Sequence, residues 1–449
     1  MFKQESGGVE EDVRRRWRRY AHRVLASEIS RISRYVDRIV QCDPLPHDDG
    51  ALIRQLGGDS GASQRIERQH ADDVVGVLLN GNLNHSHDVE GELKALLPKL
   101  ERGDRVIIVA FNPYFRGLYK LASRFGVRKG ELPDTFVTTT DLKNLAALAG
   151  YEVTRVRPAL FSPFRLLGFG AAANALLPVV PVLRELALTN VIVLRPKKAL
   201  PDGARPTLSI VIPARNEKGN IEQAVRRLLP FKDVTDIEII FVEGHSTDDT
   251  WSEIQRVVGA YSNRVTVRAY QQPGKGKADA VRHGFSKATG ELLTILDADL
   301  TMPPEMIGRF YDAYCKGLAD FVNGSRLVYP MEGEAMRFLN HLGNVFFAKA
   351  LSSALGVRLG DSLCGTKLVR RKDYERMRAW RRDFGDFDPF GDFELLFPAA
   401  SLGLGVIDVP VRYRARTYGE TNIHRFRHGL ILLRMTLTGF AKITVGPWT

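Results

Sequence analysis

The chain has 449 residues, 44% of them hydrophobic, which is enough apolar material for the cores of two or three globular domains. Its composition and the absence of a sequence repeat exclude disordered, collagen-like and repeat proteins. Lys and Arg number 64 against 52 for Asp and Glu, so the net charge of +12 favours nucleic acid, nucleotide phosphates or an acidic membrane as partners.

Cysteine usage and the N-terminus both point to a cytoplasmic protein. Cys42, Cys315 and Cys364 are far apart and form no C-x-x-C pair, which argues against a disulfide framework and a cysteine metal site. The first residues lack the apolar core of a secretory signal. We therefore expect a cytoplasmic location, with peripheral contact at the inner face of the membrane as the alternative.

Residues 1–70 predict a basic amphipathic helix followed by a linker. Leu25, Ile29 and Ile32 have helical spacing within a helix predicted over roughly 11–40, and arginines occupy many of the other positions. This helix either attaches to anionic lipid or phosphate, or packs as a surface helix with a solvated basic face. Residues 42–72 are rich in Pro, Gly, Asp and Ser and predict a loop.

Residues 71–200 predict alternating strands and helices, the pattern of a parallel α/β domain. Strands are expected at 74–79, 105–111 and 151–157, and helices at 88–100 and 140–149.

This region resembles the C-terminal part of class I S-adenosylmethionine-dependent methyltransferases, in residues 84–97, 105–111 and 141–153. The resemblance implies a truncated Rossmann-like domain. The family's glycine-rich cofactor turn is missing, because Gly57, Gly58 and Gly61 follow no credible strand. We therefore expect this domain to be noncatalytic.

The uncharged segment 166–183 reaches the length at which a membrane span must be considered. Pro178 and Pro181 would break a helix and Asn174 needs a polar partner, so we expect a buried or interfacial segment instead. A stretch rich in Pro, Lys and Arg at 194–206 predicts the domain boundary.

Beyond this boundary, three short apolar strands each end in polar residues. Ligands of open α/β sheets bind at the carboxyl ends of the strands, so these residues predict a site. The strand at 208–212 runs into Pro213-Ala-Arg215-Asn-Glu217, and the strand at 237–242 runs into Glu243-Gly-His-Ser. The third, at 291–296, ends in Asp297-Ala-Asp299, and Gly274-Lys-Gly-Lys277-Ala-Asp279 before it suits phosphate binding.

Asp297 and Asp299 are the candidate metal ligands. Alternate residues of an extended chain point the same way, so both carboxylates face one site if that geometry persists here. Two hard oxygen ligands beside a phosphate-binding loop suit Mg²⁺ or Mn²⁺.

The ordered set of these motifs resembles the inverting glycosyltransferases of family 2, which have the GT-A fold, over about 206–427. We therefore expect an α/β protein in which a GT-A domain at 205–427 follows the methyltransferase-like domain. The resemblance implies that Asp297 and Asp299 hold the metal and that Glu243 holds the base. It also implies a nucleotide-sugar pocket lined by Pro213, Arg215, Glu217, Lys277, Asp279 and Asp297.

Two further segments are similar to the dolichol- or polyprenyl-phosphate sugar transferases of that family. Phe321 to Arg326 and Arg416 to Thr421 carry arginines that, by this resemblance, bind anionic groups of the donor and the acceptor. The chain departs from those relatives at two places: Thr301 stands where they have Gln, and Thr421-Asn422 replaces their usual Ser-Lys pair.

Inverting transfer needs a base on the acceptor hydroxyl, or an acceptor phosphate that is already ionised. Asp392 is the candidate base and Glu394 the second candidate, unless these acids only compensate a helix N-terminus. Residues 361–367 are expected to form part of the acceptor wall.

Residues 428–449 predict an apolar C-terminal helix interrupted by Arg434. Two interpretations stand equally: a helix lying in the plane of a membrane, and a helix packed on the N-terminal domain. His424 and His428 are either additional metal ligands or structural residues.

We thus predict a metal-dependent, inverting glycosyltransferase that moves a sugar from UDP- or GDP-sugar to a lipid-linked phosphate or a glycan, as in the synthesis of cell-envelope polysaccharide. The alternatives are a noncatalytic nucleotide-sugar-binding or membrane-recruitment scaffold and an S-adenosylmethionine-dependent methyltransferase. Nucleic acid is not expected as a partner, because no aromatic-basic motif accompanies the charge.

Overall fold

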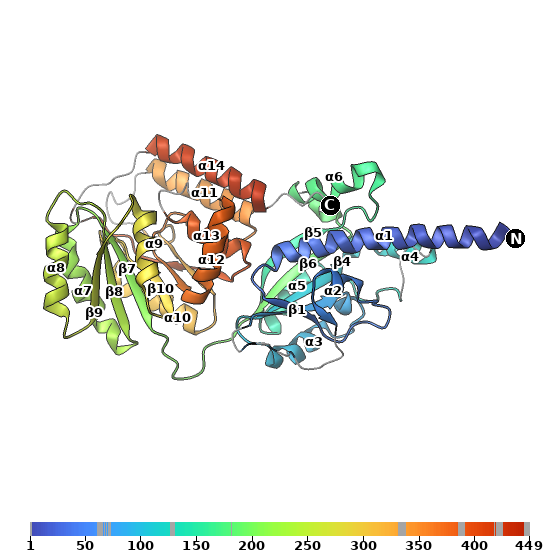
Figure 1. Ribbon diagram of the computed structural model, residues 1–449, viewed down its shortest axis with the longest axis horizontal. Coiled ribbons are helices and arrows are strands. Elements are labelled where there is room, and N and C mark those ends of the chain that lie inside the picture. Colours follow the sequence, from blue (N-terminus) through green and yellow to red (C-terminus); the bar gives the residue numbers. More distant parts are fainter. Residues whose placement is uncertain are drawn as a thin grey trace. The chain divides into compact units, whose positions relative to one another are not determined.

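The computed structural model describes residues 2–443 apart from 61–65, 67, 69, 71–72, 126–130, 181, 331–337, 385–390, 417 and 419–424. The chain forms two compact units, the first of residues 1–198 with 441–449 and the second of residues 199–440. Figure 1 shows a mixed α/β architecture in each.

The first unit is built on a six-stranded sheet of order β2-β1-β3-β4-β6-β5. All neighbouring strands are parallel except that β6 is antiparallel to both β4 and β5. The strands are β1 (Arg38–Gln41), β2 (Asp59–Ser60), β3 (Val75–Asn80), β4 (Arg105–Phe111), β5 (Tyr151–Ala159) and β6 (Thr189–Pro196). The helices are α1 (Phe2–Ile32), α2 (Ala51–Gln55), α3 (Val89–Leu96), α4 (Arg116–Arg124), α5 (Thr139–Leu148) and α6 (Phe169–Leu176).

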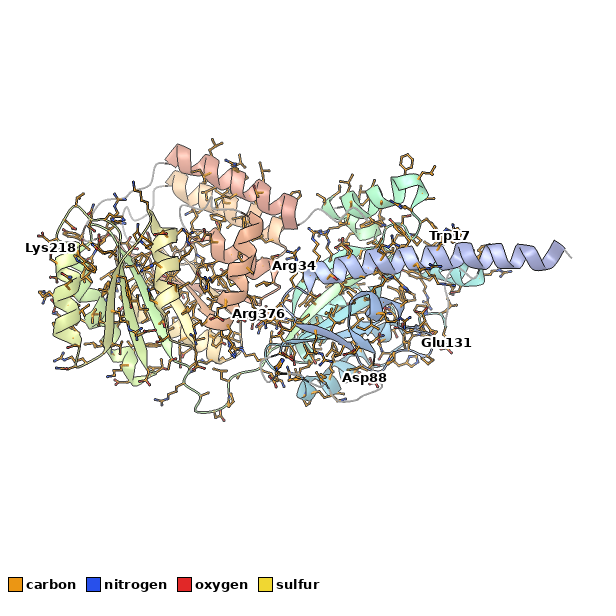
Figure 2. The ribbon with its side chains drawn as sticks, in the orientation of Figure 1. Trp17, Arg34, Asp88, Glu131, Lys218 and Arg376 are labelled. Atoms are coloured by element: carbon orange, nitrogen blue, oxygen red, sulfur yellow. The ribbon has the colours of Figure 1, made fainter. Side chains whose placement is uncertain are left out.

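Helix α1 packs on the sheet of its own unit. Leu25, Ile29 and Ile32 are buried in a core cluster with Ile107 of β4 and Val193 of β6. Near its middle, Trp17, which Figure 2 labels, contacts Phe164 edge to face with ring centroids 4.7 Å apart. Of the two predicted roles for this helix, the structure favours packing as a surface helix.

Two expectations for the N-terminal region were wrong. The helix ends at Ile32, and Arg38–Gln41 forms strand β1 because its apolar residues pair with β3. The segment 42–72, predicted as a loop, carries helix α2 and strand β2. Strand β6 was not predicted, although it is almost wholly buried between β4 and β5.

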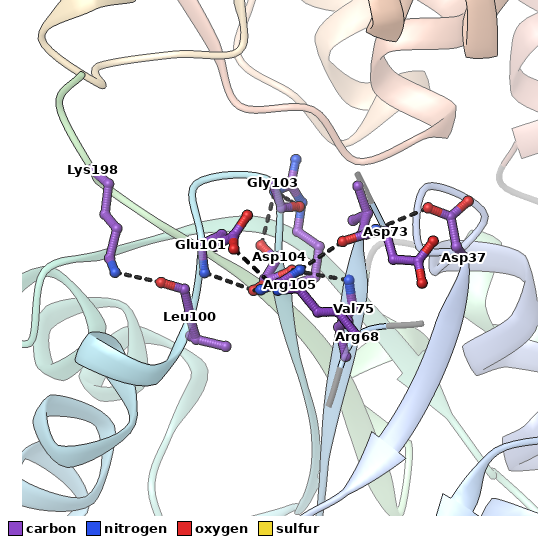
Figure 3. Close-up of polar contacts among 11 residues, drawn as sticks. Asp37, Arg68, Asp73, Val75, Leu100, Glu101, Gly103, Asp104, Arg105 and Lys198 are labelled. Carbon is purple, nitrogen blue, oxygen red and sulfur yellow. Dashed lines mark hydrogen bonds and ion pairs between the residues drawn. The ribbon is translucent and has the colours of Figure 1, made fainter. Parts of the chain in front are cut away.

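A buried polar network fixes the amino ends of β3 and β4 (Figure 3). The Asp104 carboxylate accepts hydrogen bonds from the backbone N–H of Val75 at 2.9 Å and of Glu101 at 2.7 Å. Arg68 adds an ion pair at 2.5 Å. Because the Asp104 carboxylate has donors from three segments, we interpret this network as structural.

The second unit is built on a seven-stranded sheet of order β13-β11-β12-β10-β7-β8-β9, parallel except for β12. Its strands are β7 (Leu208–Ala214), β8 (Ile237–Glu243), β9 (Thr266–Gln271), β10 (Leu292–Ile295), β11 (Phe321–Ser325), β12 (Lys367–Arg370) and β13 (Val406–Pro410). Its helices are α7 (Ile221–Leu228), α8 (Thr250–Tyr261), α9 (Lys277–Lys287), α10 (Ile307–Cys315), α11 (Phe338–Leu355), α12 (Arg371–Phe384), α13 (Phe393–Ser401) and most of α14 (Arg425–Ile443).

The continuous apolar runs predicted as strands are the buried centre of this sheet. Every residue of β8 and of β10 is buried, as expected of parallel strands covered on both faces. In the described part of the chain, no helix combines the length and apolar character needed to cross a bilayer.

Candidate active site

Charged side chains gather where the parallel strands of the second sheet end. Because β7, β8, β10 and β11 run in the same direction, the residues that follow them share one edge. Glu217 follows β7, Glu243 ends β8, Asp297 follows β10 and Arg326 follows β11. The antiparallel strand β12 begins at the same edge with the buried Lys367.

Asp297 forms an ion pair with Lys277, the first residue of α9, at 2.5 Å. Burial opposes ionisation of Asp297, but the neighbouring Lys277 and Lys367 lower the pKa of its carboxyl group. The pKa of Lys277 is raised, since Asp297, Asp392 and Asp299 outweigh the cost of its burial. These groups therefore form one electrostatically coupled cluster.

Arg416 joins two carboxylates from different strand ends. It forms ion pairs with Asp299 at 2.8 Å and with Glu217 at 3.1 Å. Glu217 also accepts a hydrogen bond from Asn220 at 2.7 Å. Burial raises the pKa of Glu217 to about 7, although Arg416 and Asn220 oppose the shift.

The backbone of Asp297 to Leu300 is a turn and not an extended segment. The backbone N–H of Leu300 donates to the Asp297 carbonyl at 3.2 Å, and Leu300 has a φ of 52°. The extended geometry on which the alternation of Asp297 and Asp299 depends is therefore not present. Asp299 is instead oriented by the Thr301 hydroxyl, which donates to its carboxylate at 2.8 Å.

The other expected nucleotide residues differ in exposure. Pro213 is half-buried in β7 and Arg215 is exposed. Glu243 accepts hydrogen bonds from the Ser246 N–H at 2.5 Å and from Gln271 at 3.3 Å, and these contacts lower its pKa against the effect of burial. Asp279 accepts from the Gly274 N–H at 2.8 Å. Glu243 thus organises the loop that follows β8, and Asp279 organises the loop that precedes α9.

The expected acceptor-side residues are engaged in ion pairs that are buried or half-buried. Asp361 holds Arg326 through two contacts of 2.7 and 2.9 Å. Lys367 contacts Asp392 at 2.7 Å, and Arg282 contacts Glu394 at 2.6 Å.

No individual role for Asp361, Lys367 or Arg282 was expected from the sequence. The first two lie in the segment 361–367, predicted only as an acceptor wall. Arg282 follows Asp279 by three residues, one helical turn, a spacing that could have placed it beside the site.

Comparisons of the sequence with known proteins identify the family of this chain. Residues 209–378 match the sequence profile of "Glycosyl transferase family 2". The dolichyl-phosphate hexose transferase of Haloferax volcanii is 31% identical over 225 residues, which are 49% of this chain and 89% of that protein. The chain belongs to glycosyl transferase family 2.

Other similar proteins carry related names. The dolichol-phosphate mannosyltransferase of Pyrococcus furiosus is 28% identical to this family 2 chain over 222 residues, 48% of this chain. The match spans only 59% of that relative's length. A glucosyl-3-phosphoglycerate synthase from Mycobacterium tuberculosis, crystallised with uridine diphosphate, is 20% identical, with a TM-score of 0.39 over 54% of this chain and 82% of that one.

The carboxylates of this family 2 site fit a hard divalent cation that keeps several non-protein ligands. Asp297 and Asp299 supply oxygen donors at one strand end, the ligand type that Mg²⁺ prefers. Among the described residues, no group of three or more His, Cys, Asp or Glu forms a complete metal site. Substrate phosphates and water would have to complete the coordination shell.

Several expected residues lie outside the described part of the chain. These are Glu420, Thr421, Asn422 and His424, and the side chain of His428. In α14, Leu432 and Met435 are buried, whereas Leu430, Leu433 and Leu437 are exposed.

Proposed function

We propose that this chain transfers a sugar from a nucleoside diphosphate sugar to a polyprenyl phosphate, with inversion at the anomeric carbon. The coupled cluster of Asp297, Lys277, Asp299 and Arg416 at the strand ends is the observation that carries the proposal. The names of the Haloferax and Pyrococcus relatives support the acceptor class.

The donor diphosphate would bind at this cluster in a GT-A arrangement. A bound Mg²⁺ or Mn²⁺ on Asp297 and Asp299 would neutralise charge that develops on the leaving diphosphate. Lys277 and Arg416, released from their carboxylates, would then contact the phosphate oxygens. Arg215, Glu243 and Asp279 remain our candidates for contacts to the nucleoside of a UDP- or GDP-sugar.

The ion pairs of the two candidate bases favour a phosphate as the acceptor. Asp392 and Glu394 are each paired with a cation at 2.7 and 2.6 Å, an arrangement that does not favour taking a proton from a hydroxyl. A phosphate acceptor needs no base. Its oxygen would attack the anomeric carbon while the bond from that carbon to the nucleoside diphosphate breaks.

The test is transfer of labelled sugar by the purified full chain. A panel of UDP- and GDP-sugars is incubated with Mn²⁺ or Mg²⁺, with a polyprenyl phosphate or with a glycan acceptor. We expect a labelled lipid product that chelation of the metal abolishes. Product with the glycan alone, lost in Asp392→Asn, would favour a hydroxyl acceptor with Asp392 as the base.

A noncatalytic scaffold is the second candidate, because Lys277 and Arg416 pair with the two aspartates and so compensate the charge that a metal ion would otherwise balance. Stabilisation by nucleotide sugars without sugar consumption across the whole donor panel would favour it. We propose no methyl transfer for the first unit, since the chain leaves β1 through Cys42-Asp-Pro-Leu-Pro46, without a glycine turn.

A further inference from the structure

One edge of the sheet in the first unit carries an exposed apolar surface. Helix α4 follows β4, and residues 160–188 connect β5 to β6, so both emerge where β4 and β5 end and β6 begins. Asn112, just before α4, joins the two segments by donating to the carbonyls of Glu185 at 2.9 Å and Ala187 at 2.7 Å.

Nearly half of the exposed large apolar side chains in the described part of the chain belong to residues 112–125, which include α4, and to residues 160–188. We call them the α4–α6 surface: Tyr114, Leu118, Leu121, Phe125, Leu166, Leu167, Phe169, Leu176, Val180, Val182 and Leu186. Exposed apolar side chains that gather in this way indicate an interaction site, whereas single exposed apolar residues are common on any protein surface.

A buried side-chain amide anchors the start of the segment that leads to Leu166 and Leu167. Asn174 is buried, accepts hydrogen bonds from the N–H groups of Phe161 at 2.7 Å and Ser162 at 2.9 Å, and donates to Tyr20 of α1 at 3.3 Å. Above this clamp, Leu166 and Leu167 have φ values of 43° and 54°. Leucine rarely adopts this left-handed backbone conformation. The side chain of Leu167 is fully exposed to solvent.

The charges beside these apolar groups are positive. Arg116, Lys120 and Arg124 are exposed along α4 at intervals of four residues, and the sequence from 112 to 125 contains no Asp or Glu. Arg165 and Arg184 flank α6, and the acidic Glu185 is paired with Arg184 at 3.2 Å. Apolar side chains among cations are complementary to an anionic lipid surface.

We propose that the α4–α6 surface docks the first unit on an anionic membrane. Its leucine and aromatic side chains enter the headgroup region, while the lysine and arginines contact lipid phosphates. Docking by this surface is independent of sugar transfer and is separate from any contact made by α14.

Co-sedimentation of the full chain with vesicles tests the proposal. No donor or acceptor is added, so failure of the proposed catalysis does not affect the result. We expect binding to vesicles of phosphatidylcholine with phosphatidylglycerol, weakened by salt, and much less to phosphatidylcholine alone. Leu166→Ser/Leu167→Ser should lower the partition roughly tenfold. Leu132→Ser/Leu148→Ser, a pair of exposed leucines elsewhere in the unit, should leave it unchanged.

A charge-reversal variant and its control test the contribution of the cations to membrane binding. Arg116→Glu/Lys120→Glu/Arg124→Glu should reduce binding to the anionic vesicles about a hundredfold or more. Lys143→Glu, on the exposed side of α5, should have little effect.

Absence of vesicle binding by the wild type, or wild-type binding by both α4–α6 variants, would overturn the proposal. Loss of self-association in these variants, without any vesicle binding, would show that a second copy covers the surface instead. Circular dichroism confirms folding, and Leu118→Ser/Leu121→Ser on α4 replaces the leucine pair if that variant does not fold.

Discussion

At the residue scale, Gly365 leaves the space in which Asp297 and Lys277 meet. A Cβ at this position would lie closer than 3.0 Å to both side chains. We expect Gly365→Ala to displace the ion pair and lower the rate of sugar transfer roughly ten- to a hundredfold, with little loss of stability. Gly259→Ala is the control, since nothing lies within 4 Å of its added methyl group. Equal rates for the two variants would contradict this role.

Glu217 predicts a pH dependence of stability. Below pH 4.5 its carboxyl group is protonated in the folded and the unfolded chain, and it has no effect. Between pH 4.5 and about 7 only the unfolded chain releases the proton, so stability falls as the pH rises and then stays lower. The loss is about 3 kcal/mol.

The comparison of the wild type with Glu217→Gln measures this loss, because glutamine does not titrate. Hydrogen exchange of β7 amides at both ends of the pH window gives the free energy of opening for each protein. As the pH rises, the free energy of opening of the wild type should fall relative to that of Glu217→Gln. A difference that is independent of pH would show that Glu217 ionises normally.

The sequence supplied most of the residues at the strand ends but not their partners. Asp297, Asp299, Glu217 and Arg416 could be placed near one another because parallel strands end at one edge and Arg416 lies in a recognisable motif. That Arg416 bridges Asp299 and Glu217 could not be predicted. The contact joins segments distant in sequence, and side-chain direction in turns follows no simple period.

At the element scale, a buried ion pair holds α1 on the first sheet. Glu28 of α1 contacts Arg157 of β5 at 2.8 Å, and both side chains are buried. Burial, and next the nearby Arg157, lower the pKa of Arg31 and Arg155 to about 10, and Glu28 opposes both shifts. Glu28 therefore compensates a cluster of arginines.

Glu28→Ala should lower the free energy of opening of the first unit by about 3 to 5 kcal/mol, since it leaves buried positive charge uncompensated. Hydrogen exchange of β5 amides in the full chain reports this change. As a control, Glu90→Ala on α3 removes an exposed pair with Lys94 and should cost about 0.5 kcal/mol. Unchanged β5 protection in Glu28→Ala would mean that α1 does not depend on this pair.

Elements with a clear period were predicted well, and those defined by tertiary contacts were not. Strand β4 matches its predicted bounds, because a continuous apolar run between the charged Asp104 and the turn-forming Asn112-Pro113 has few alternatives. Strand β1 was assigned to the preceding helix, since Val36 and Ile39 continue the helical spacing of Ile29 and Ile32. At Arg38–Gln41, only the pairing with β3 distinguishes a strand from a continued helix.

At the scale of the whole molecule, the chain joins a family 2 unit to a second α/β unit. The boundary between the units falls after Lys198, within the stretch rich in Pro, Lys and Arg. The methyltransferase-like character of the first unit stays a prediction. Its exposed α4–α6 surface could not be predicted from composition, because which apolar residues face solvent depends on the packing of β4, β5 and β6.

Transfer of labelled sugar to polyprenyl phosphate by Asp297→Asn/Asp299→Asn tests the central claim most directly. We expect the wild type and Asp202→Asn, a change at an exposed aspartate near the boundary, to form labelled lipid at equal rates. The double variant should be slower by about a thousandfold or more, because charge on the leaving diphosphate loses its compensation. Wild-type rates in the folded double variant would contradict the assignment of this strand edge as the catalytic centre.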